Sequence, residues 1–264
     1  MKKYLVIGNP IEHSLSPKLH NYWIKKNNIK AVYEKKKIVE KDIKNIILKI
    51  KDGDIQGINV TVPFKKSVIP FLNKLSPEAK ETQSVNTIYK EGEEIVGHNT
   101  DIAGFELSLR HSKYDVKEKK VLILGAGGVV PSIIFSIKKM GASKIILCNR
   151  TLERAEQLKK HFPEVEIIKW GEEIDFEMII NATSVGLKSD DEIKFNYLDK
   201  ARNKFFFDVI YNPNQTNFLK KANKNGNRTE NGKMMFIYQA HQAFTIWHKV
   251  MPEINDDTVK LLEK

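Results

Sequence analysis

The strongest pattern in the chain is an apolar run that ends in glycines and is followed by apolar residues at helical spacing. Val121–Leu124 is short enough for one buried strand, and Gly125, Gly127 and Gly128 come directly after it. Apolar residues then recur at the spacing of a helix. Strand, glycine turn and helix in this order are typical of a dinucleotide-binding crevice. The glycines let the backbone approach a pyrophosphate, and the helix N-terminus supplies N–H donors.

The glycine turn has a second interpretation. Val130 stands where the pattern G-x-G-x-x-G has its third small residue, so the glycines could serve a plain strand-to-helix turn. Pro131 fits both interpretations, because the N–H groups in the first turn of a helix have no partner within the helix.

Further apolar runs continue the alternation of strands and helices after the glycines. Besides the strand at 121–124, we expect strands at 144–148, 165–168, 177–180 and 204–209, with helices between them. A hydrophilic linker is predicted from Asn223 to Lys233. The long helix predicted after this linker carries an apolar stripe that must cover a core. The stripe consists of Phe236, Ile237, Ala240, Phe244 and Trp247.

The first hundred or so residues form a second alternating region. Strands are expected at Tyr4–Ile7, at 32–38 and from Gly57 to the proline at 63, separated by helical patterns. This order predicts a small, mostly parallel sheet that is independent of the later one. A helix that begins at Asp101 is expected to bridge the two domains. The chain is therefore predicted to be an α/β protein of two domains.

The residues after the strand at 144–148 favour one dinucleotide over another. In an NAD site, an acidic residue at this strand end usually accepts a hydrogen bond from the ribose 2′-hydroxyl. Here the strand ends in Asn149, Arg150 and Thr151, with Arg154 one helical turn further on. The arginines could bind a 2′-phosphate, which predicts NADP. The alternative is a helix cap at Thr151 with two solvated arginines.

Polar residues also follow the strands of the first region. Ser14 and Ser16 precede Pro17 at a predicted helix start, where Ser16 is a ready N-cap. Two hydroxyls at a helix N-terminus also suit a carboxylate. Lys65 follows the strand that begins at Gly57, and ligands of parallel sheets bind beyond the carboxyl ends of strands.

Composition narrows the choice of partners. The chain has 264 residues, and 44 Lys and Arg against 33 Asp and Glu give a net charge of +11. Such a charge raises the question of nucleic acid. The lysines, however, are scattered and form no stripe with interleaved aromatic residues, so we expect no nucleic-acid partner. A positive field would still help to collect an anionic cofactor and substrate.

The same composition bears on compartment and metal chemistry. A single cysteine, Cys148, excludes an intramolecular disulfide and fits a reducing cytoplasm. No signal peptide or membrane-spanning run is expected, so a soluble cytoplasmic protein is predicted. The histidines show no metal-ligand spacing, and His241 and His248 are expected to be core or rim residues. We therefore expect no metal.

Seven motifs, in this order, resemble the shikimate dehydrogenase family over nearly the whole chain. The first two and the Asn-Thr-Asp triplet are more specific than any glycine fingerprint. The motifs are Gly8–Pro17, Asn59–Lys65, Val85–Thr87, Asn99–Asp101, Gly125–Gly128, Asn149–Thr151 and Tyr238–Ala240. The resemblance implies the NADPH-dependent reduction of 3-dehydroshikimate to shikimate, a step toward the aromatic amino acids.

The resemblance also implies a role for individual residues. Lys65 and Asp101 would be catalytic. The substrate-binding residues would be Ser14, Ser16 and Tyr211 near the carboxylate, and Thr61, Asn86 and Gln239 around the ring. The cofactor-binding residues would be Gly125, Ala126, Gly127, Gly128, Val129, Asn149, Arg150, Thr151, Arg154, Thr183, Val209 and Met234. Met234 stands where the family commonly has a glycine whose backbone meets the nicotinamide end, and Gln83 stands where it often has glycine.

The resemblance further implies how the chain is divided. A discontinuous substrate-binding domain would comprise residues 1–101 and 234–264, with the C-terminal helices returning to it. A Rossmann-type NADP-binding domain would comprise residues 102–233. The oligomeric state stays open, with a homodimer as one option.

Lys65 and Asp101 each have a plainer explanation. Lys65 adjoins Lys66 and is one of many lysines, so a solvated surface position is the default. Asp101 opens a helix, where a capping role is common. In a ketone reduction, by contrast, a nearby ammonium can stabilise the developing alkoxide and donate its proton. Asp101 could orient this ammonium and accept a hydrogen bond from a substrate hydroxyl.

Two other functions remain as alternatives. A quinate/shikimate dehydrogenase would use NAD and NADP more evenly, and an acid after Cys148 would favour it. A nucleotide-sensing module without catalysis would keep the glycine turn. It would not need Ser14, Ser16, Lys65 and Asp101 together.

Overall fold

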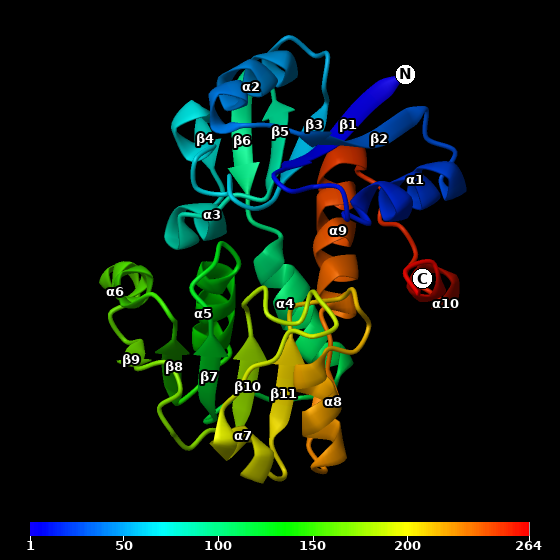
Figure 1. The fold of residues 1–264 in the computed structure, drawn as a ribbon. Helices are drawn as coiled ribbons and strands as arrows, with labels where there is room; N and C mark the ends of the chain where they lie inside the picture. The colour runs from blue at the N-terminus through cyan, green and yellow to red at the C-terminus, as the bar shows by residue number, and fades with distance from the viewer. Residues whose placement is uncertain (264) are drawn as a thin grey trace. The chain divides into compact units, whose positions relative to one another are not determined.

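The computed structural model describes residues 1–263, which fall into two compact units (Figure 1). The first unit comprises Met1–Gly104 and the chain from Ile237 onward, and the second comprises Phe105–Phe236. The bounds expected from the sequence, at 101 and 234, each lie three residues before these. Both changes of unit fall inside helices, α4 (Asp101–His111) and α9 (Lys233–His248).

The second unit contains a six-stranded sheet in which every neighbouring pair is parallel. Its order is β12-β11-β10-β7-β8-β9. The first strand of the unit, β7, therefore lies mid-sheet, with the next two strands on one side and the last three on the other. This is the dinucleotide-binding order, with its switch point between β7 and β10. The strands are β7 (Lys120–Leu124), β8 (Lys144–Cys148), β9 (Glu166–Ile168), β10 (Met178–Asn181), β11 (Phe205–Asp208) and β12 (Arg228–Glu230).

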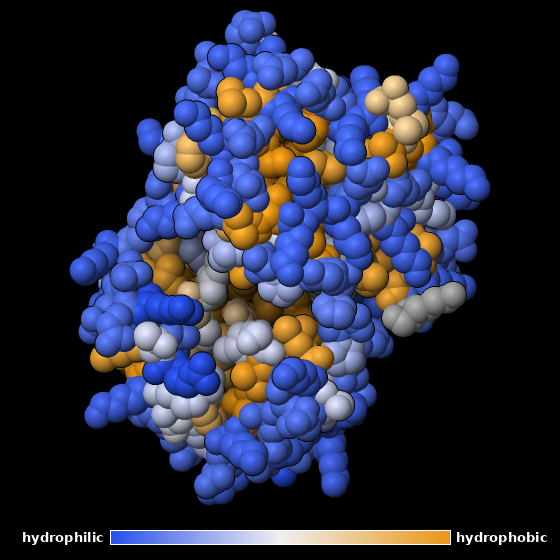
Figure 2. Space-filling view, turned by 45° about the horizontal axis from the view of Figure 1, so that its top comes forward, coloured by the Kyte–Doolittle hydropathy of each residue, from blue (hydrophilic) through white to orange (hydrophobic). Residues whose placement is uncertain are grey.

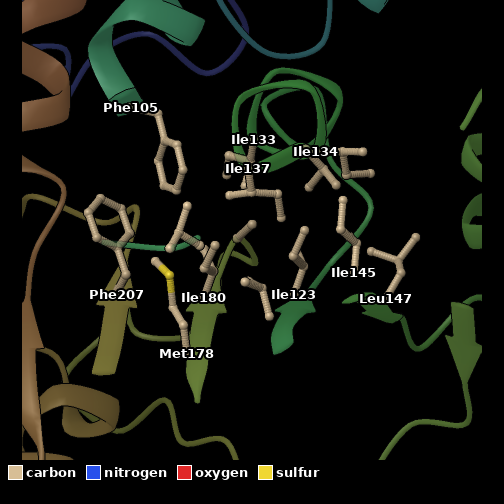
Figure 3. Packing of buried hydrophobic residues seen from close by; sticks show 14 of the residues in the cluster. Phe105, Ile123, Ile133, Ile134, Ile137, Ile145, Leu147, Met178, Ile180 and Phe207 are labelled. Carbon is tan, nitrogen blue, oxygen red and sulfur yellow. The ribbon is translucent and has the colours of Figure 1, made fainter. Parts of the chain in front are cut away.

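Helices cover both faces of this sheet, which explains why its strands are apolar without alternation. On one face, Val121 and Ile123 pack with Ile133 and Ile137 of α5, as Figure 3 shows for the last three. On the other face, Leu122 packs in a cluster that contains residues of α7 and α8. The helices of this unit after α4 are α5 (Val130–Lys139), α6 (Leu152–His161), α7 (Asn196–Lys200) and α8 (Asn217–Lys224).

The linker predicted from Asn223 to Lys233 is wrong. Helix α8 ends at Lys224, and strand β12 (Arg228–Glu230) then pairs with β11 at the edge of the sheet. An edge strand forms its ladder through the backbone on one side only. Its side chains, Arg228, Thr229 and Glu230, stay exposed or half-buried, so the apolar signal of a strand is missing.

The first unit contains a mixed six-stranded sheet of order β2-β1-β3-β5-β6-β4. The pairs β3–β5 and β5–β6 are antiparallel and the other three are parallel. The strands are β1 (Lys2–Gly8), β2 (Ala31–Lys37), β3 (Gly57–Val60), β4 (Lys74–Leu75), β5 (Thr87–Glu91) and β6 (Glu94–His98). The helices are α1 (Ser16–Lys26), α2 (Ile43–Lys51), α3 (Pro77–Thr82) and α10 (Asp256–Lys260), with 3-10 turns η1 (Glu40–Asp42) and η2 (Ile69–Phe71).

Strand β3 is shorter and more buried than its alternating sequence indicates. It ends at Val60, before the proline, and all four of its residues are buried, including the polar Asn59. Gln83, which follows α3, has a φ of +49°. A left-handed backbone of this kind favours glycine, which agrees with the glycine that the resemblance implies at this position.

The C-terminal helices return to the first unit. Part of α9 packs on β3, where a Cβ at Gly57 would lie 2.5 Å from Nε1 of Trp247. The indole of Trp23 in α1 also donates a hydrogen bond to the carbonyl of Glu253. The apolar stripe of α9 from Ile237 onward therefore completes the core of the first unit.

Hydrophilic residues cover most of the face shown in Figure 2, and hydrophobic residues emerge there only in separate areas. Within residues 1–263, no helix is both long enough and apolar enough to cross a membrane.

The contact between Gly57 and Trp247 predicts a stability effect. Gly57→Ala places a methyl group against the rigid indole, so it should destabilise the protein by about 1–3 kcal/mol. Denaturant unfolding would measure this. The double variant Gly57→Ala/Trp247→Phe has a smaller ring at the contact, so its loss should be smaller than the sum of the two single losses. Additive losses would mean that the methyl group does not press on the indole.

Candidate active site

The centre of the site in the first unit is an ion pair between two buried side chains. Lys65 lies in the turn after β3, and Asp101 is the first residue of α4. The Nζ of Lys65 lies 2.5 Å from Oδ2 of Asp101, and their side chains are 11% and 8% exposed. Lys66, the next residue, is exposed. A solvated surface position is therefore wrong for Lys65.

The second carboxylate oxygen of Asp101 also has a partner. The amide of Asn86 donates one hydrogen bond to Oδ1 of Asp101 at 2.9 Å and another to the hydroxyl of Thr100 at 3.0 Å. Its oxygen accepts from the backbone N–H of Thr100 at 2.8 Å. Asp101 thus opens α4 with a carboxylate that binds Lys65 and Asn86.

Backbone hydrogen bonds hold the segments of this site together. The N–H of Val85 donates to the carbonyl of Lys65, and the N–H of Val60 donates to the carbonyl of Asn86. The segment 85–86 is therefore hydrogen-bonded both to the turn that carries Lys65 and to the end of β3. The positions of the two side chains are set by the sheet.

A second layer of buried polar groups lies behind Asn86, and sequence reasoning assigned no role to it. The hydroxyl of Tyr33 donates to Oδ1 of Asn59 at 2.7 Å. The amide of Asn59 donates to the carbonyl of Asn86 at 3.0 Å and to the hydroxyl of Thr87 at 3.1 Å. Burial raises the pKa of Tyr33 well above its ordinary value, so this hydroxyl stays protonated and can donate. In the sequence, the only indication of this layer is Asn59, a polar residue among the apolar residues of a predicted strand.

Ser14 and Ser16 lie at the start of α1, close to the same layer. The helix begins at Ser16, its N-cap residue is Leu15, and no side chain caps it. The prediction that Ser16 caps the helix is therefore wrong. The hydroxyl of Ser14 instead accepts from the N–H of Ser16 at 3.3 Å, and the hydroxyl of Ser16 hydrogen-bonds with Tyr33.

The loop that carries the serines contacts the end of β3. A Cβ on Gly8 would lie 2.5 Å from Cγ2 of Thr61, so only glycine allows this approach. The N–H of Asn9 donates to the carbonyl of Val62 at 3.0 Å. Thr61 is half-buried at this contact, and Gln239 is half-buried on α9.

The glycine turn of the second unit fits a bound dinucleotide. Gly125 has a φ of +106°, and a Cβ there would lie 2.8 Å from the carbonyl oxygen of Ala182. Gly127 and Gly128 are exposed, and α5 follows with Val129 as its N-cap residue and a proline in the first turn. Val130 is buried in the core, so the larger residue at this position packs under the helix. Exposed backbone ahead of a helix N-terminus suits a pyrophosphate.

The strand end after Cys148 presents positive charge to solvent. Arg150 and Arg154 are exposed, and neither forms an ion pair with any residue from 1 to 263. Thr151 is the N-cap residue of α6, but its side chain makes no capping hydrogen bond. Its carbonyl accepts from the amide of Asn149 at 2.6 Å. The arginines are thus available to a phosphate.

Thr183, Val209, Tyr211 and Met234 lie beyond the carboxyl ends of β10 and β11 or at the start of α9. The N–H of Val209 donates to the carbonyl of Asn181 at 3.0 Å. The ring of Tyr211 stacks on Phe236 with centroids 4.5 Å apart. The side chain of Met234 is buried. Among residues 1–263, no group of three His, Cys, Asp or Glu side chains could hold a metal ion.

Two family models match the chain. Residues 6–88 match the shikimate dehydrogenase substrate binding domain, and residues 106–217 match the shikimate / quinate 5-dehydrogenase family. A shikimate dehydrogenase (NADP(+)) from Pelagibacter ubique (strain HTCC1062) is 62% identical over 262 residues, which cover 99% of each protein. The chain belongs to the shikimate dehydrogenase family.

Solved shikimate dehydrogenases share the fold. The crystal structure of the enzyme from Aquifex aeolicus has a TM-score of 0.91 and 38% identity, covering 99% of this chain and 97% of that one. A shikimate dehydrogenase structure in complex with NADP+ also has a TM-score of 0.91, with 34% identity over 100% of this chain and 93% of that one. The predicted two-domain α/β fold is confirmed. As a family member, the chain is an NADP-dependent oxidoreductase that acts on a CH–OH group of a small molecule.

Removal of the Tyr33 hydroxyl should lower the stability of the protein. Tyr33→Phe leaves the buried oxygen of Asn59 without its donor, which should cost about 1–3 kcal/mol of stability. The loss should appear in denaturant unfolding. Tyr22→Phe in α1 is the matched control, because no hydrogen bond to a described residue is found for its hydroxyl, and its stability should stay within about 0.5 kcal/mol of wild type. Equal effects of the two variants would contradict a role for the Tyr33–Asn59 bond.

Proposed function

We propose that Lys65 and Asp101 act as one unit in the reversible NADPH-dependent reduction of 3-dehydroshikimate to shikimate. This reaction is the activity of the family, a step of the shikimate pathway, and the chain catalyses it as a family member. The observation that carries the assignment is the 2.5 Å ion pair of two side chains that are almost fully buried. Burying an ion pair stabilises a protein no better than apolar packing, so a buried pair after a strand end supports a role in the reaction.

The geometry supports a division of roles between the two side chains. When bound, NADPH supplies the hydride. The ammonium of Lys65 stabilises the negative charge that develops on the carbonyl oxygen and can donate a proton to it. Asp101 holds this ammonium in place, and Asn86 holds Asp101 from the other side. The carboxylate of Asp101 can also accept a hydrogen bond from a ring hydroxyl of the substrate.

Substrate binding completes the proposal. In the first unit, Ser14 and Ser16 would bind the carboxylate, and Thr61, Asn86 and Gln239 would surround the ring. The family resemblance also assigns Tyr211, a residue of the second unit, to the carboxylate. The contact between Gly8 and Thr61 supports this grouping, because it joins the serine loop to the end of β3. Both amide hydrogens of Asn86 are donated within the protein, to Asp101 and Thr100, so its role at the ring is to orient the carboxylate of Asp101.

Cofactor binding is assigned to the second unit. The turn formed by Gly125, Ala126, Gly127, Gly128 and Val129 would bind the pyrophosphate. Asn149, Arg150, Thr151 and Arg154 would bind the adenosine ribose and its 2′-phosphate. Thr183, Val209 and Met234 would lie near the nicotinamide. Arg150 and Arg154 are exposed and have no ion-pair partner in the described part of the chain, which supports NADP over NAD because their charge can bind a 2′-phosphate.

The proposal extends to partners and location. A cytoplasmic location fits the single cysteine, and the scattered lysines give no surface for nucleic acid. A homodimer is the oligomeric state to test. The alternative activity is oxidation of quinate with relaxed use of NAD. One spectrophotometric assay decides between the two, since it follows reduction of NADP or NAD with shikimate and then with quinate. Equal efficiency with NAD and NADP would favour the alternative.

The paired roles of Lys65 and Asp101 predict a kinetic pattern. Lys65→Ala should lower kcat by ~10²–10⁴-fold, because it removes the charge that faces the alkoxide. Asp101→Asn keeps the shape but loses the carboxylate, so it should also lower kcat strongly. The double variant should lose much less than the product of the two single losses.

Lys66→Ala is the matched control, because it removes an exposed ammonium from the adjacent position. Its kcat should stay near wild type. Melting curves must accompany the kinetics, since each single variant leaves one buried charge unpaired. A Lys65→Ala enzyme with near-normal kcat would refute the catalytic assignment.

The proposed contact between Arg150 and the 2′-phosphate predicts a change in the KM for NADP. A charged hydrogen bond contributes about 1.5–3 kcal/mol, so Arg150→Ala should raise the KM for NADP by roughly ten- to a hundredfold and leave that for shikimate nearly unchanged. Lys159→Ala removes a charge from the last turn of α6, the helix that begins two residues after Arg150, and should change neither constant. If Arg150→Ala and Lys159→Ala raise the NADP KM equally, the effect comes from the general field and not from phosphate binding.

A further inference from the structure

Two polar side chains at the ends of neighbouring strands are fully buried and have no role in the reaction as described above. Asn181 ends β10 and Asp208 ends β11, and both have no exposed surface. The two strands are paired so that these residues are direct neighbours. A carboxylate this deeply buried is costly unless several donors bind it.

Asp208 is bound by three donors. Its Oδ1 accepts from the amide of Asn181 at 3.1 Å and from the backbone N–H of Ile210 at 3.0 Å. Its Oδ2 accepts from the hydroxyl of Thr216 at 2.6 Å. Burial nevertheless raises the pKa of Asp208 to about 6. The carboxylate therefore anchors both ends of the loop 209–216 that follows its own strand.

Asn181 performs the same task for the loop that follows β10. Its oxygen accepts from the N–H of Thr183 at 3.1 Å and from the Thr183 hydroxyl at 2.7 Å. Its amide nitrogen donates to the carbonyl of Val185 at 3.0 Å as well as to Asp208. The bond between Asn181 and Asp208 thus connects the loop 182–186 to the loop 209–216.

Tight packing reinforces this connection. Gly186 has a φ of +118°, and a Cβ there would lie 3.0 Å from Cγ2 of Thr216 and 3.3 Å from Cδ1 of Ile210. A Cβ on Gly232 would lie 2.1 Å from the carbonyl oxygen of Val209. The two loops therefore lie against each other, and the backbone of Val209 also packs closely against Gly232.

We propose that Asn181, Asp208 and Thr216 are positioning residues that join these two loops into one rigid support for the nicotinamide end of the cofactor. The inference rests on the proposed assignment of Thr183 and Val209 to that end. The adenosine ribose and its 2′-phosphate are assigned to Asn149, Arg150, Thr151 and Arg154 after β8, and no hydrogen bond within residues 1–263 joins Asn181, Asp208 or Thr216 to them. Loss of the support should therefore impair hydride transfer more than it impairs binding of the adenosine end.

Thr216 provides the sharpest test, because a near-isosteric change removes only its hydroxyl. Thr216→Val deprives Oδ2 of Asp208 of its donor, whereas Thr216→Ser retains the hydroxyl. A small misplacement of reacting groups lowers the rate steeply, so kcat of Thr216→Val should fall on the order of ten- to a hundredfold. Thr216→Ser should recover most of the wild-type kcat. Binding of adenosine 2′,5′-bisphosphate, which carries only the adenosine end, should stay unchanged in both.

A stability control is needed, because the Thr216 hydroxyl also caps α8 by accepting from the N–H of Leu219. Ala222→Gly weakens the same helix without touching Asp208. It should lower the melting temperature but keep kcat near wild type.

A second variant tests the bond between the loops. Asn181→Asp keeps the acceptor for Thr183 but loses the donors to Asp208 and to the carbonyl of Val185, and it places a second buried carboxyl group beside Asp208. It should lower kcat while adenosine 2′,5′-bisphosphate still binds, and a wild-type kcat would contradict a role for Asn181.

Three results would overturn the proposal: a wild-type kcat in Thr216→Val, equal kcat losses in Thr216→Val and Thr216→Ser, or weakened binding of adenosine 2′,5′-bisphosphate in parallel with kcat. An inactive wild-type enzyme with shikimate and NADP would instead refute the proposed function itself.

Discussion

The candidate active site depends on the pairing of one ammonium, that of Lys65, with one carboxylate, that of Asp101, away from water. Removing both charges from solvent is expensive, and the protein offsets the cost with hydrogen bonds to the remaining oxygen of Asp101 and with a fixed backbone around Lys65. The hydrogen bond to Asp101 in turn requires further buried hydrogen bonds inside the unit. Asn86 must present its amide to Asp101, Asn59 must hold the backbone of Asn86, and Tyr33 must satisfy Asn59. The polar residues inside the first unit are therefore a consequence of the pair at its edge.

Each unit contains a buried carboxylate, and the two units stabilise it with different partners. In the first, a buried ion pair is surrounded by amide and hydroxyl groups. In the second, a buried carboxylate without a cation is stabilised by three neutral donors, and burial still raises its pKa to about 6. The Lys65–Asp101 pair lies beyond the ends of β3 and β6, and Asn181 and Asp208 are the last residues of β10 and β11, so in both units charged or polar groups converge at the carboxyl ends of strands.

Sequence predicted the parts of the fold that local apolar patterns determine. The buried strands of the second unit, its glycine turn and the α/β class follow from runs such as Val121–Leu124, which are buried on both faces. Strand β12 escaped detection because an exposed edge strand forms through its backbone and leaves no apolar trace. The cap expected from Ser16 is absent because the helix begins at that residue and its hydroxyl turns to Tyr33. The burial of Lys65 beside an exposed Lys66 is a tertiary property, as is the network through Tyr33 and Asn59. Motifs identified Lys65 and Asp101, but only the fold shows that they touch.

The first unit consists of two segments separated by the whole of the second. Gly57 in its sheet packs against Trp247, and Trp23 in α1 donates a hydrogen bond to Glu253. Part of its core therefore comes from residues after 236. The second unit is continuous. On the ribosome, the second unit can therefore reach its complete structure while the first, although synthesised earlier, still lacks the segment that closes it. The first unit, whose strands are synthesised first, is therefore the last of the two that can be completed.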